Sequence, residues 1–251
     1  MDFAGKRALV TGASRGIGKR VAEMLAEQGA HVAVHYNSGR SAAEATFVSL
    51  AGGGHALVQA DIGDPQQVRR MVEEASAALG GIDILVNNAG IYNEHPVLSV
   101  SFEQWQADWN AILNTNLVGA ANAIYWAVRH MPETGGAVVN VSSRGAFRGE
   151  SAGPAYGASK AGMNSMGQSL AVALAPRNIH VITIAPGWVE TDMAAEHLNG
   201  PSGDAIRNQS PFGRVASVDD VAYAVLVAAA DQARFMSGTV IDVNGASYLR
   251  T

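Results

Sequence analysis

TGASRGIG, residues Thr11–Gly18, follows the apolar run Arg7–Val10 directly and precedes a segment with the apolar spacing of a helix. Glycines let a backbone approach a phosphate closely, and the first turn of a helix offers unpaired N–H groups and a partial positive charge. The spacing is Gly-x-x-x-Gly-x-Gly rather than the usual Gly-x-Gly-x-x-Gly. The stretch therefore predicts a pyrophosphate site between a strand and a helix, with an ordinary strand–helix turn as the alternative.

Short apolar runs alternate with longer helix-type segments along the rest of the chain. The runs mostly lack polar alternation, which is typical of strands buried on both faces of a parallel sheet. We expect strands at 7–10, 31–35, 56–59, 82–86, 137–141, 180–184 and 239–243, and helices near 17–28, 41–50, 65–79, 102–131, 155–175 and 218–230. This pattern predicts a single α/β domain over 1–251. We expect a Rossmann-type, doubly wound parallel sheet of about seven strands, in the order 3-2-1-4-5-6-7, with helices on both faces.

The composition excludes several classes of site. The chain of 251 residues has no cysteine, so it holds no disulfide, thiolate metal site or cysteine nucleophile. Its formal net charge of −5 argues against nucleic acid or an anionic membrane as a partner. The longest apolar run, Val221–Ala230, is too short for the ~20 residues that span a bilayer, and the N-terminus lacks a secretory signal. We therefore expect a cytoplasmic protein.

The end of the second expected strand distinguishes two forms of dinucleotide. An NAD site places an acid there to bind the ribose 2′-hydroxyl, but this chain has Tyr36, Asn37 and Ser38. Arg15 lies within the glycine turn and Arg40 just beyond the second strand, and a guanidinium suits a 2′-phosphate. The sequence favours NADP(H), with NAD(H) as the alternative. Either arginine could instead be a surface charge, and this applies more to Arg40.

Polar and glycine residues follow one expected strand after another. Asp61-Ile62 follows the third strand, Asn87–Gly90 the fourth, Ser142-Ser143 the fifth and Pro186-Gly187 the sixth. In an open parallel sheet the carboxyl ends of the strands share one edge, where ligands bind. The sequence therefore predicts an active-site edge.

Tyr156 and Lys160 lie four residues apart in a helix-type segment and so share one helix face. An ammonium near a phenol stabilises the phenolate and lowers its pKa from ~10 toward neutrality. The spacing alone also fits a partly buried tyrosine beside a surface lysine. However, the chain has only three lysines beside fourteen arginines, and a titratable ammonium requires lysine.

Together, TGASRGIG, NNAG at 87–90, Asn116 within NTNLVG, Ser143, YGASK at 156–160 and PGWVET at 186–191 resemble the short-chain dehydrogenase/reductase family, in its 3-oxoacyl-[acyl-carrier-protein] reductase-like branch. The resemblance covers residues 5–245. It implies an NADP-dependent oxidoreductase that transfers a hydride between nicotinamide and a carbonyl or secondary alcohol. The alternative is a catalytically silent dinucleotide-binding regulator or scaffold, which we would expect to have lost part of this set.

The resemblance also implies roles for four residues. Tyr156 would be the general acid of reduction, or the base of oxidation, and Ser143 would bind the substrate oxygen. Lys160 would hold the nicotinamide ribose and lower the pKa of Tyr156. Asn116 would hold a water that links Lys160 to solvent. The implied cofactor contacts are Gly12, Ser14, Arg15, Gly16, Ile17, Gly18, Tyr36, Asn37, Ser38, Asp61, Ile62, Asn88, Ala89, Gly90, Tyr156, Lys160, Pro186, Gly187, Val189 and Thr191.

Substrate contacts are expected from 91–97, 144–150 and a lid around 188–210, within the irregular stretch 186–216. The candidates are Ser143, His95, Phe147, Trp188 and Met193, and no histidine spacing indicates a metal site.

We expect a small-molecule carbonyl or alcohol substrate and a homotetramer packed through helices 102–131 and 155–175. An acyl carrier protein stays open as a partner, since 131–136 lacks a basic residue for docking whereas Arg177 offers one.

Overall fold

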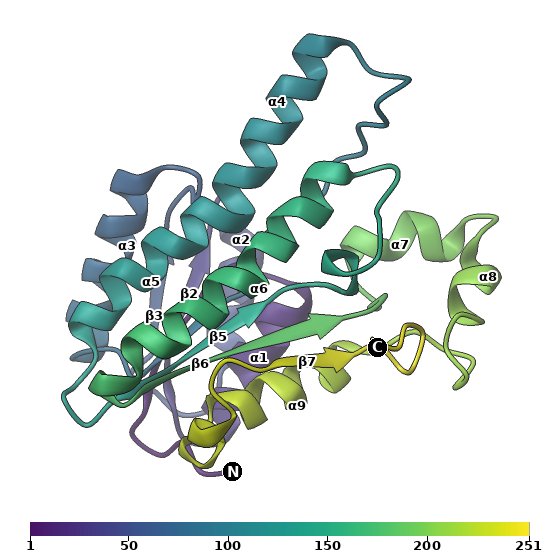
Figure 1. Ribbon diagram of the computed structural model, residues 1–251. Coiled ribbons are helices and arrows are strands. Elements are labelled where there is room, and N and C mark those ends of the chain that lie inside the picture. The colour runs from purple at the N-terminus through teal and green to yellow at the C-terminus, as the bar shows by residue number, and fades with distance from the viewer. Residues whose placement is uncertain (251) are drawn as a thin grey trace.

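The computed structural model of the chain, which describes residues 1–250, contains one parallel sheet of seven strands in the order β3-β2-β1-β4-β5-β6-β7. Both the parallel sheet and the strand order were expected, so the predicted fold class is confirmed. The strands are β1 (Arg7–Val10), β2 (His31–Tyr36), β3 (Ala56–Gln59), β4 (Ile84–Asn87), β5 (Gly136–Val141), β6 (Ile179–Pro186) and β7 (Val240–Val243). Their residues are apolar on both faces because helices cover both sides of the sheet (Figure 1).

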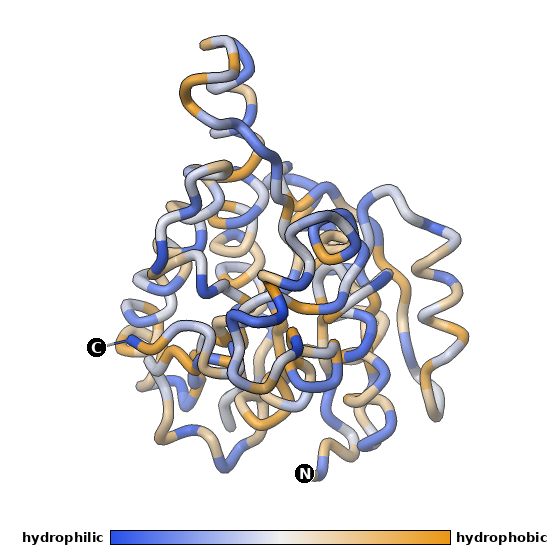
Figure 2. The backbone as a smooth tube through the Cα atoms, turned by 90° about the vertical axis from the view of Figure 1, so that its right-hand side faces the viewer, coloured by the Kyte–Doolittle hydropathy of each residue, from blue (hydrophilic) through white to orange (hydrophobic). Residues whose placement is uncertain are grey.

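The helices form two layers, each over its own apolar core. One layer comprises α1 (Gly16–Glu27), α2 (Arg40–Ser49) and α9 (Val218–Ala229), and the other α3 (Pro65–Leu79), α5 (Gly119–His130) and α6 (Pro154–Leu174). α4 (Phe102–Leu113) packs against α6 and projects with its preceding segment beyond the sheet (Figures 1 and 2). The core therefore fixes the ends of the strands, where the site forms.

The ends of several elements follow local chemistry that the sequence shows. Gly80 ends α3 in the left-handed conformation (φ 80°), and Ser217 and Asp220 form a complete capping box on α9. At α4, Ser101 accepts from the Gln104 N–H, but the Gln104 side chain donates to Asp108 instead of returning to the cap.

Two segments differ from the expectation. The expected helix 102–131 is interrupted by a π-helical turn, η1 (Asn114–Val118), which separates α4 from α5. The stretch 186–216, expected to be irregular, contains α7 (Asp192–Asn199) and α8 (Gly203–Arg207). These two helices are short and pack on a small cluster of their own, so helical periodicity over a long window does not reveal them.

The register of the sheet brings the carboxyl ends of its central strands together. Val10 at the end of β1 pairs with Val34 and with Val86, and Asn87 pairs with Asn140. Asn87 Nδ2 also donates to Asn140 Oδ1 over 3.0 Å. The segments that follow β1, β4 and β5 therefore begin at one edge, as the sequence predicted. Among residues 1–250, no helix combines the length and apolarity that a bilayer crossing requires.

Candidate cofactor and active site

A cavity of about 840 Å³ lies at the carboxyl edge of the sheet, within the range of small-molecule sites. Its walls come from the glycine turn after β1, the ends of β2 to β6, the start of α6 and the amino half of α7. Nineteen of the twenty cofactor residues expected from sequence line it: Gly12, Ser14, Arg15, Gly16, Ile17, Tyr36, Asn37, Ser38, Asp61, Ile62, Asn88, Ala89, Gly90, Tyr156, Lys160, Pro186, Gly187, Val189 and Thr191.

Gly18 is the exception, and its place explains why a glycine stands there. It lies inside α1 against the carbonyl of Gly12 and the side chain of Asn88, and a Cβ would overlap both. Gly18 therefore lets the helix approach the turn, whereas Gly12 and Gly16, with φ of 64° and 55°, shape the turn itself.

A side-chain latch joins the glycine turn to the end of β4. Asn88 Nδ2 donates to the carbonyls of Thr11 (2.9 Å) and Gly12 (3.0 Å). In return, Thr11 Oγ1 accepts from the backbone N–H groups of Asn88 and Ala89. The cofactor floor and the phosphate turn are therefore held as one unit.

His35 fixes the other side of the turn, which the sequence analysis did not foresee. Its Nδ1 accepts from the Gly12 N–H over 3.0 Å, and its Nε2 donates to the carbonyl of Ala60 over 3.0 Å. Burial lowers the pKa of His35 from 6.5 to about 4. The neutral imidazole thus connects the ends of β1 and β3, and protonation of Nδ1 would remove an acceptor that the turn uses.

Tyr156 and Lys160 both face the cavity from the first turns of α6. Lys160 is 4% exposed, and its Nζ donates to the carbonyl of Val141 at the end of β5 over 2.8 Å. The same Nζ lies 5.8 Å from the centre of the Tyr156 ring. The expected pair is therefore assembled at the sheet edge, with its ammonium bound to the backbone rather than to the phenol.

The protonation of this pair differs from the expectation. Burial lowers the pKa of Lys160 to about 8. Burial raises the pKa of Tyr156 above 10, and Glu150 adds to this, while the Ser143 hydroxyl opposes it. The sequence predicted a lowered Tyr156 pKa, whereas burial of the phenol raises it in the structure. The phenol is protonated at neutral pH, the state that a proton donor requires.

Asn116 lies behind the cavity wall rather than in it. It is fully buried within the η1 turn; its Oδ1 accepts from the Ile91 N–H over 2.8 Å, and its Nδ2 donates to Ser159 Oγ over 3.2 Å. A Cβ placed on Gly90 would lie 3.3 Å from Asn116 Oδ1 and 3.5 Å from Lys160 Nζ. Asn116 therefore ties the segment after β4 to α6 beside Lys160.

The expected substrate residues divide into two groups. Ser143, Trp188 and Met193 line the cavity. His95 and Phe147 do not, which corrects their expected placement. His95 is buried and accepts from the Ala155 N–H through Nε2. Phe147 lies under the guanidinium of Arg250, 4.3 Å from the ring centre.

Four further side chains line the cavity but were not among the predicted site residues: Glu94, Thr115, Arg144 and Glu150. Arg144 stands directly after Ser143, and that position was the available clue.

The chain shares its sequence and fold with known enzymes along nearly its whole length. A family model described as enoyl-(acyl carrier protein) reductase matches residues 12–246. The 3-oxoacyl-[acyl-carrier-protein] reductase FabG of Staphylococcus aureus is 36% identical over 97% of this chain and 98% of its own.

Solved structures agree with these relatives. A short-chain dehydrogenase from Burkholderia cenocepacia in complex with NADP has a TM-score of 0.89 at 36% identity, covering 98% of this chain and 99% of its own. A blue fluorescent protein from a metagenomic library, in complex with NADPH, has a TM-score of 0.90 at 33% identity, covering 99% and 100%. Fold, site and relatives together define an NAD(P)-dependent oxidoreductase. The chain belongs to the short-chain dehydrogenase/reductase family.

His35 gives the fold a testable dependence on pH. Its pKa of about 4 in the folded chain lies below its ordinary value of 6.5, so the unfolded state binds the proton first as the pH falls. The contribution of neutral His35 to the free energy of unfolding is complete above pH 6.5. About 3 kcal/mol of it is lost as the pH falls to 4. We expect urea unfolding of wild type and His35→Gln to show a smaller fall between pH 7 and pH 4 for the variant. His197→Gln, on α7, serves as the control and should fall as wild type does, whereas equal falls in wild type and His35→Gln would contradict the role given to His35.

Proposed function

We propose that the protein is an NADP-dependent oxidoreductase that transfers a hydride between nicotinamide and a carbonyl or secondary alcohol, with Tyr156 as the general acid or base. One observation carries the proposal: the Tyr156 phenol, the Ser143 hydroxyl and the Lys160 ammonium line the same cavity as the glycine turn. A proton donor, an oxygen-binding hydroxyl and a cation therefore lie around one space that also holds a dinucleotide turn. The catalytically silent alternative is not favoured, since Asn116 is present as well.

The hydrogen bonds support a division of labour for reduction. Ser143 Oγ accepts from the Gly145 N–H over 3.0 Å, so its own proton can be donated to Tyr156 or, when substrate is bound, to the carbonyl oxygen. Tyr156, protonated at neutral pH, donates its proton to that oxygen as negative charge develops. The nicotinamide, when bound, supplies the hydride.

Lys160 and Asn116 act on Tyr156 after it has given up its proton. The ammonium of Lys160 stabilises the phenolate and, when the cofactor is bound, binds the nicotinamide ribose. Asn116 holds a water that passes a proton from solvent toward Lys160. The π-helical turn around Asn116 supports this role, because such a turn leaves a backbone carbonyl without its usual helical partner.

Tyr156→Phe tests the chemistry. Removal of the phenolic proton should lower kcat for reduction of activated ketones by roughly 10²–10⁴-fold, with NADPH affinity changed only a few-fold. Tyr92→Phe is the matched control: its ring packs edge-on against Tyr156, with ring centres 5.3 Å apart, and lines the same cavity, but Tyr92 is not the tyrosine that shares a helix face with Lys160. Loss of NADPH absorbance reports turnover. No turnover of any ketone by wild type that binds NADPH would support the regulator instead, and full activity of Tyr156→Phe would rule out its role.

The preference for NADP over NAD rests on Arg15. It lines the cavity with Asn37 and Ser38, and its nearest carboxylate, Asp192, is 3.6 Å away in an exposed and therefore screened pair. Arg40, the other arginine considered for the 2′-phosphate, points to Glu44 at 2.8 Å and does not line the cavity. We therefore assign the 2′-phosphate to Arg15 rather than to Arg40.

The two arginines form a matched pair for experiment. Arg15→Gln should weaken NADPH binding by roughly ten-fold and leave NADH binding nearly unchanged, because a charge-assisted bond to the 2′-phosphate is lost. Arg40→Gln should change neither affinity. Fluorescence titration with both cofactors measures these values. An equal loss for NADPH and NADH in Arg15→Gln, or a selective loss in Arg40→Gln, would contradict the assignment.

We propose that the chain works as one catalytic domain, residues 1–251, with a lid at 188–210. α7 and α8 have a small apolar cluster of their own, made of Ala194, Leu198, Ile206 and Val215. Across the cavity, His197 Nε2 lies 3.6 Å from Glu94 Oε1. A segment with its own apolar cluster, joined to the opposite side of the cavity by this ion pair, is suited to act as a lid that opens for substrate.

We propose a small-molecule carbonyl or alcohol as the substrate, and an acyl carrier protein stays open as a partner. Arg177, the basic residue considered for carrier docking, is exposed and donates from Nη2 to the carbonyl of Met131 over 3.3 Å, which leaves its other N–H groups for a partner.

We further propose a homotetramer, supported by exposed apolar side chains on the long helices: Phe102 on α4, Tyr125 on α5 and Val172 on α6. Apolar surface of this kind is typical of contacts between subunits. Light scattering at micromolar concentration should give four times the chain mass, and a monomer would contradict the assembly.

A further inference from the structure

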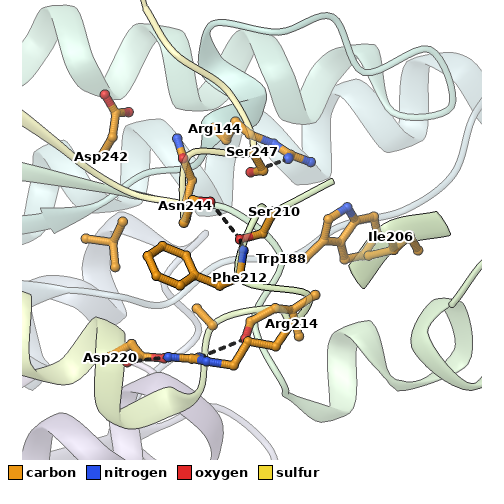
Figure 3. Close-up of a pocket in the computed structure, with 14 residues that line it drawn as sticks. Arg144, Trp188, Ile206, Ser210, Phe212, Arg214, Asp220, Asp242, Asn244 and Ser247 are labelled. Carbon is orange, nitrogen blue, oxygen red and sulfur yellow. Dashed lines mark hydrogen bonds and ion pairs between the residues drawn. The ribbon is translucent and has the colours of Figure 1, made fainter. Parts of the chain in front are cut away.

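A second cavity, of about 250 Å³, adjoins the first, and Figure 3 shows the side chains around it. Arg144 and Trp188 line both cavities, so they form the wall between them. Arg144 follows Ser143 directly in the short helix η2 (Arg144–Ala146). A charged group thus stands beside the hydroxyl that holds the substrate oxygen.

The other charges of the small cavity are already paired. Arg214 lies 2.6 Å from Asp220, and Asp242 lies 2.7 Å from Arg250. Arg144 differs: within residues 1–250 no carboxylate oxygen comes within 4 Å of its guanidinium. Its side-chain hydrogen bond runs from Nη1 to the Ser247 hydroxyl over 2.7 Å (Figure 3).

Burial makes it energetically unfavourable for the Arg144 guanidinium to lack a carboxylate partner. Arg144 is 5% exposed, and burial together with repulsion from Arg148 lowers its pKa. Glu150 acts on Arg144 through space, but burial raises the pKa of Glu150 despite both arginines, so this acid does not serve as a tight counter-ion. A buried guanidinium without a carboxylate is unfavourable unless a bound anion completes it.

We propose that Arg144 binds a carboxylate of the substrate, so that the enzyme reduces keto acids or oxidises the matching hydroxy acids. The inference rests on the proposed function and names its substrate class. With the carbonyl oxygen at Ser143 and Tyr156, a carboxylate further along the same molecule reaches the wall of the large cavity that Arg144 forms. A carboxylate fits because a single guanidinium balances one negative charge and its planar fork matches two oxygens, whereas a phosphate dianion would keep one charge unbalanced.

The kinetic test compares keto acids of increasing chain length with their methyl esters, which lack the negative charge at one end and carry one added methyl group there. Wild type should favour the acid over its ester by roughly 10–100-fold in kcat/KM at the best length, as charge-assisted hydrogen bonds do. Arg144→Met should lose that ratio. Ser247→Ala removes the hydroxyl partner but keeps the guanidinium, so it should keep the ratio, which separates anion binding from tethering of the C-terminal segment.

A binding test works without turnover. Calorimetry of the protein saturated with NADP⁺ should detect straight-chain alkanoates but not the matching amides, and Arg144→Met should lose the alkanoates. Inorganic phosphate is titrated in the same way as a second ligand. Stronger binding of phosphate than of alkanoate would overturn the carboxylate assignment.

Together the two tests distinguish failure of the anion site from failure of the proposed reductase function. Alkanoate binding that needs Arg144, with no ketone reduced, would reject the proposed function and keep the anion site. Ketone reduction with equal kcat/KM for acid and ester, or a ratio that survives in Arg144→Met, would reject the anion site and keep the reductase. Alkanoate binding that is absent in wild type, or unchanged in Arg144→Met, would also overturn the inference.

Discussion

The arrangement of the site depends on one buried cation. The ammonium of Lys160 is almost fully enclosed, and its hydrogen bond within residues 1–250 goes to the carbonyl of Val141. Burying a charge with so little compensation is unfavourable, and the pKa of about 8 reflects this. The bond fixes α6 to the end of β5 and so places Tyr156 in the cavity. A ligand that brings hydroxyl groups to the ammonium would relieve the cost, which favours binding of a ribose there.

Close approach of backbones makes this enclosure achievable. Gly18 lets α1 pass against Gly12, and Gly167 lets α6 lie against β6, where a Cβ would come within 2.9 Å of Thr183 Oγ1. The Asn88 latch and His35 then hold the turn from two sides. The Asn88 and His35 contacts also satisfy backbone groups of the turn, so the chain itself holds this edge in place. The fold thus supplies position, and the chemistry comes from a few side chains on it.

The sequence predicted the sheet well because its strands are buried on both faces, and such runs are distinct whatever the neighbouring elements do. The glycine turn, Ser143, Tyr156 and Lys160 were likewise recognisable from type and spacing. Tertiary packing decided which of the other side chains reach the cavity and which of them lack a partner. His95 and Phe147 are aromatic residues in the expected loops, yet contacts with Ala155 and Arg250 hold them outside the cavity. Arg144 is informative only because it has no carboxylate partner, and the lack of a partner is a property of the folded chain.

A crystal structure of the chain with NADP⁺ would show whether the phenol of Tyr156 and the ammonium of Lys160 face a bound nicotinamide across the cavity. We expect a dinucleotide with its pyrophosphate at Gly12–Ile17, its ribose hydroxyls at Lys160 and its nicotinamide beside Tyr156. A dinucleotide bound elsewhere, or a complex in which these two side chains turn away from it, would refute the proposed site.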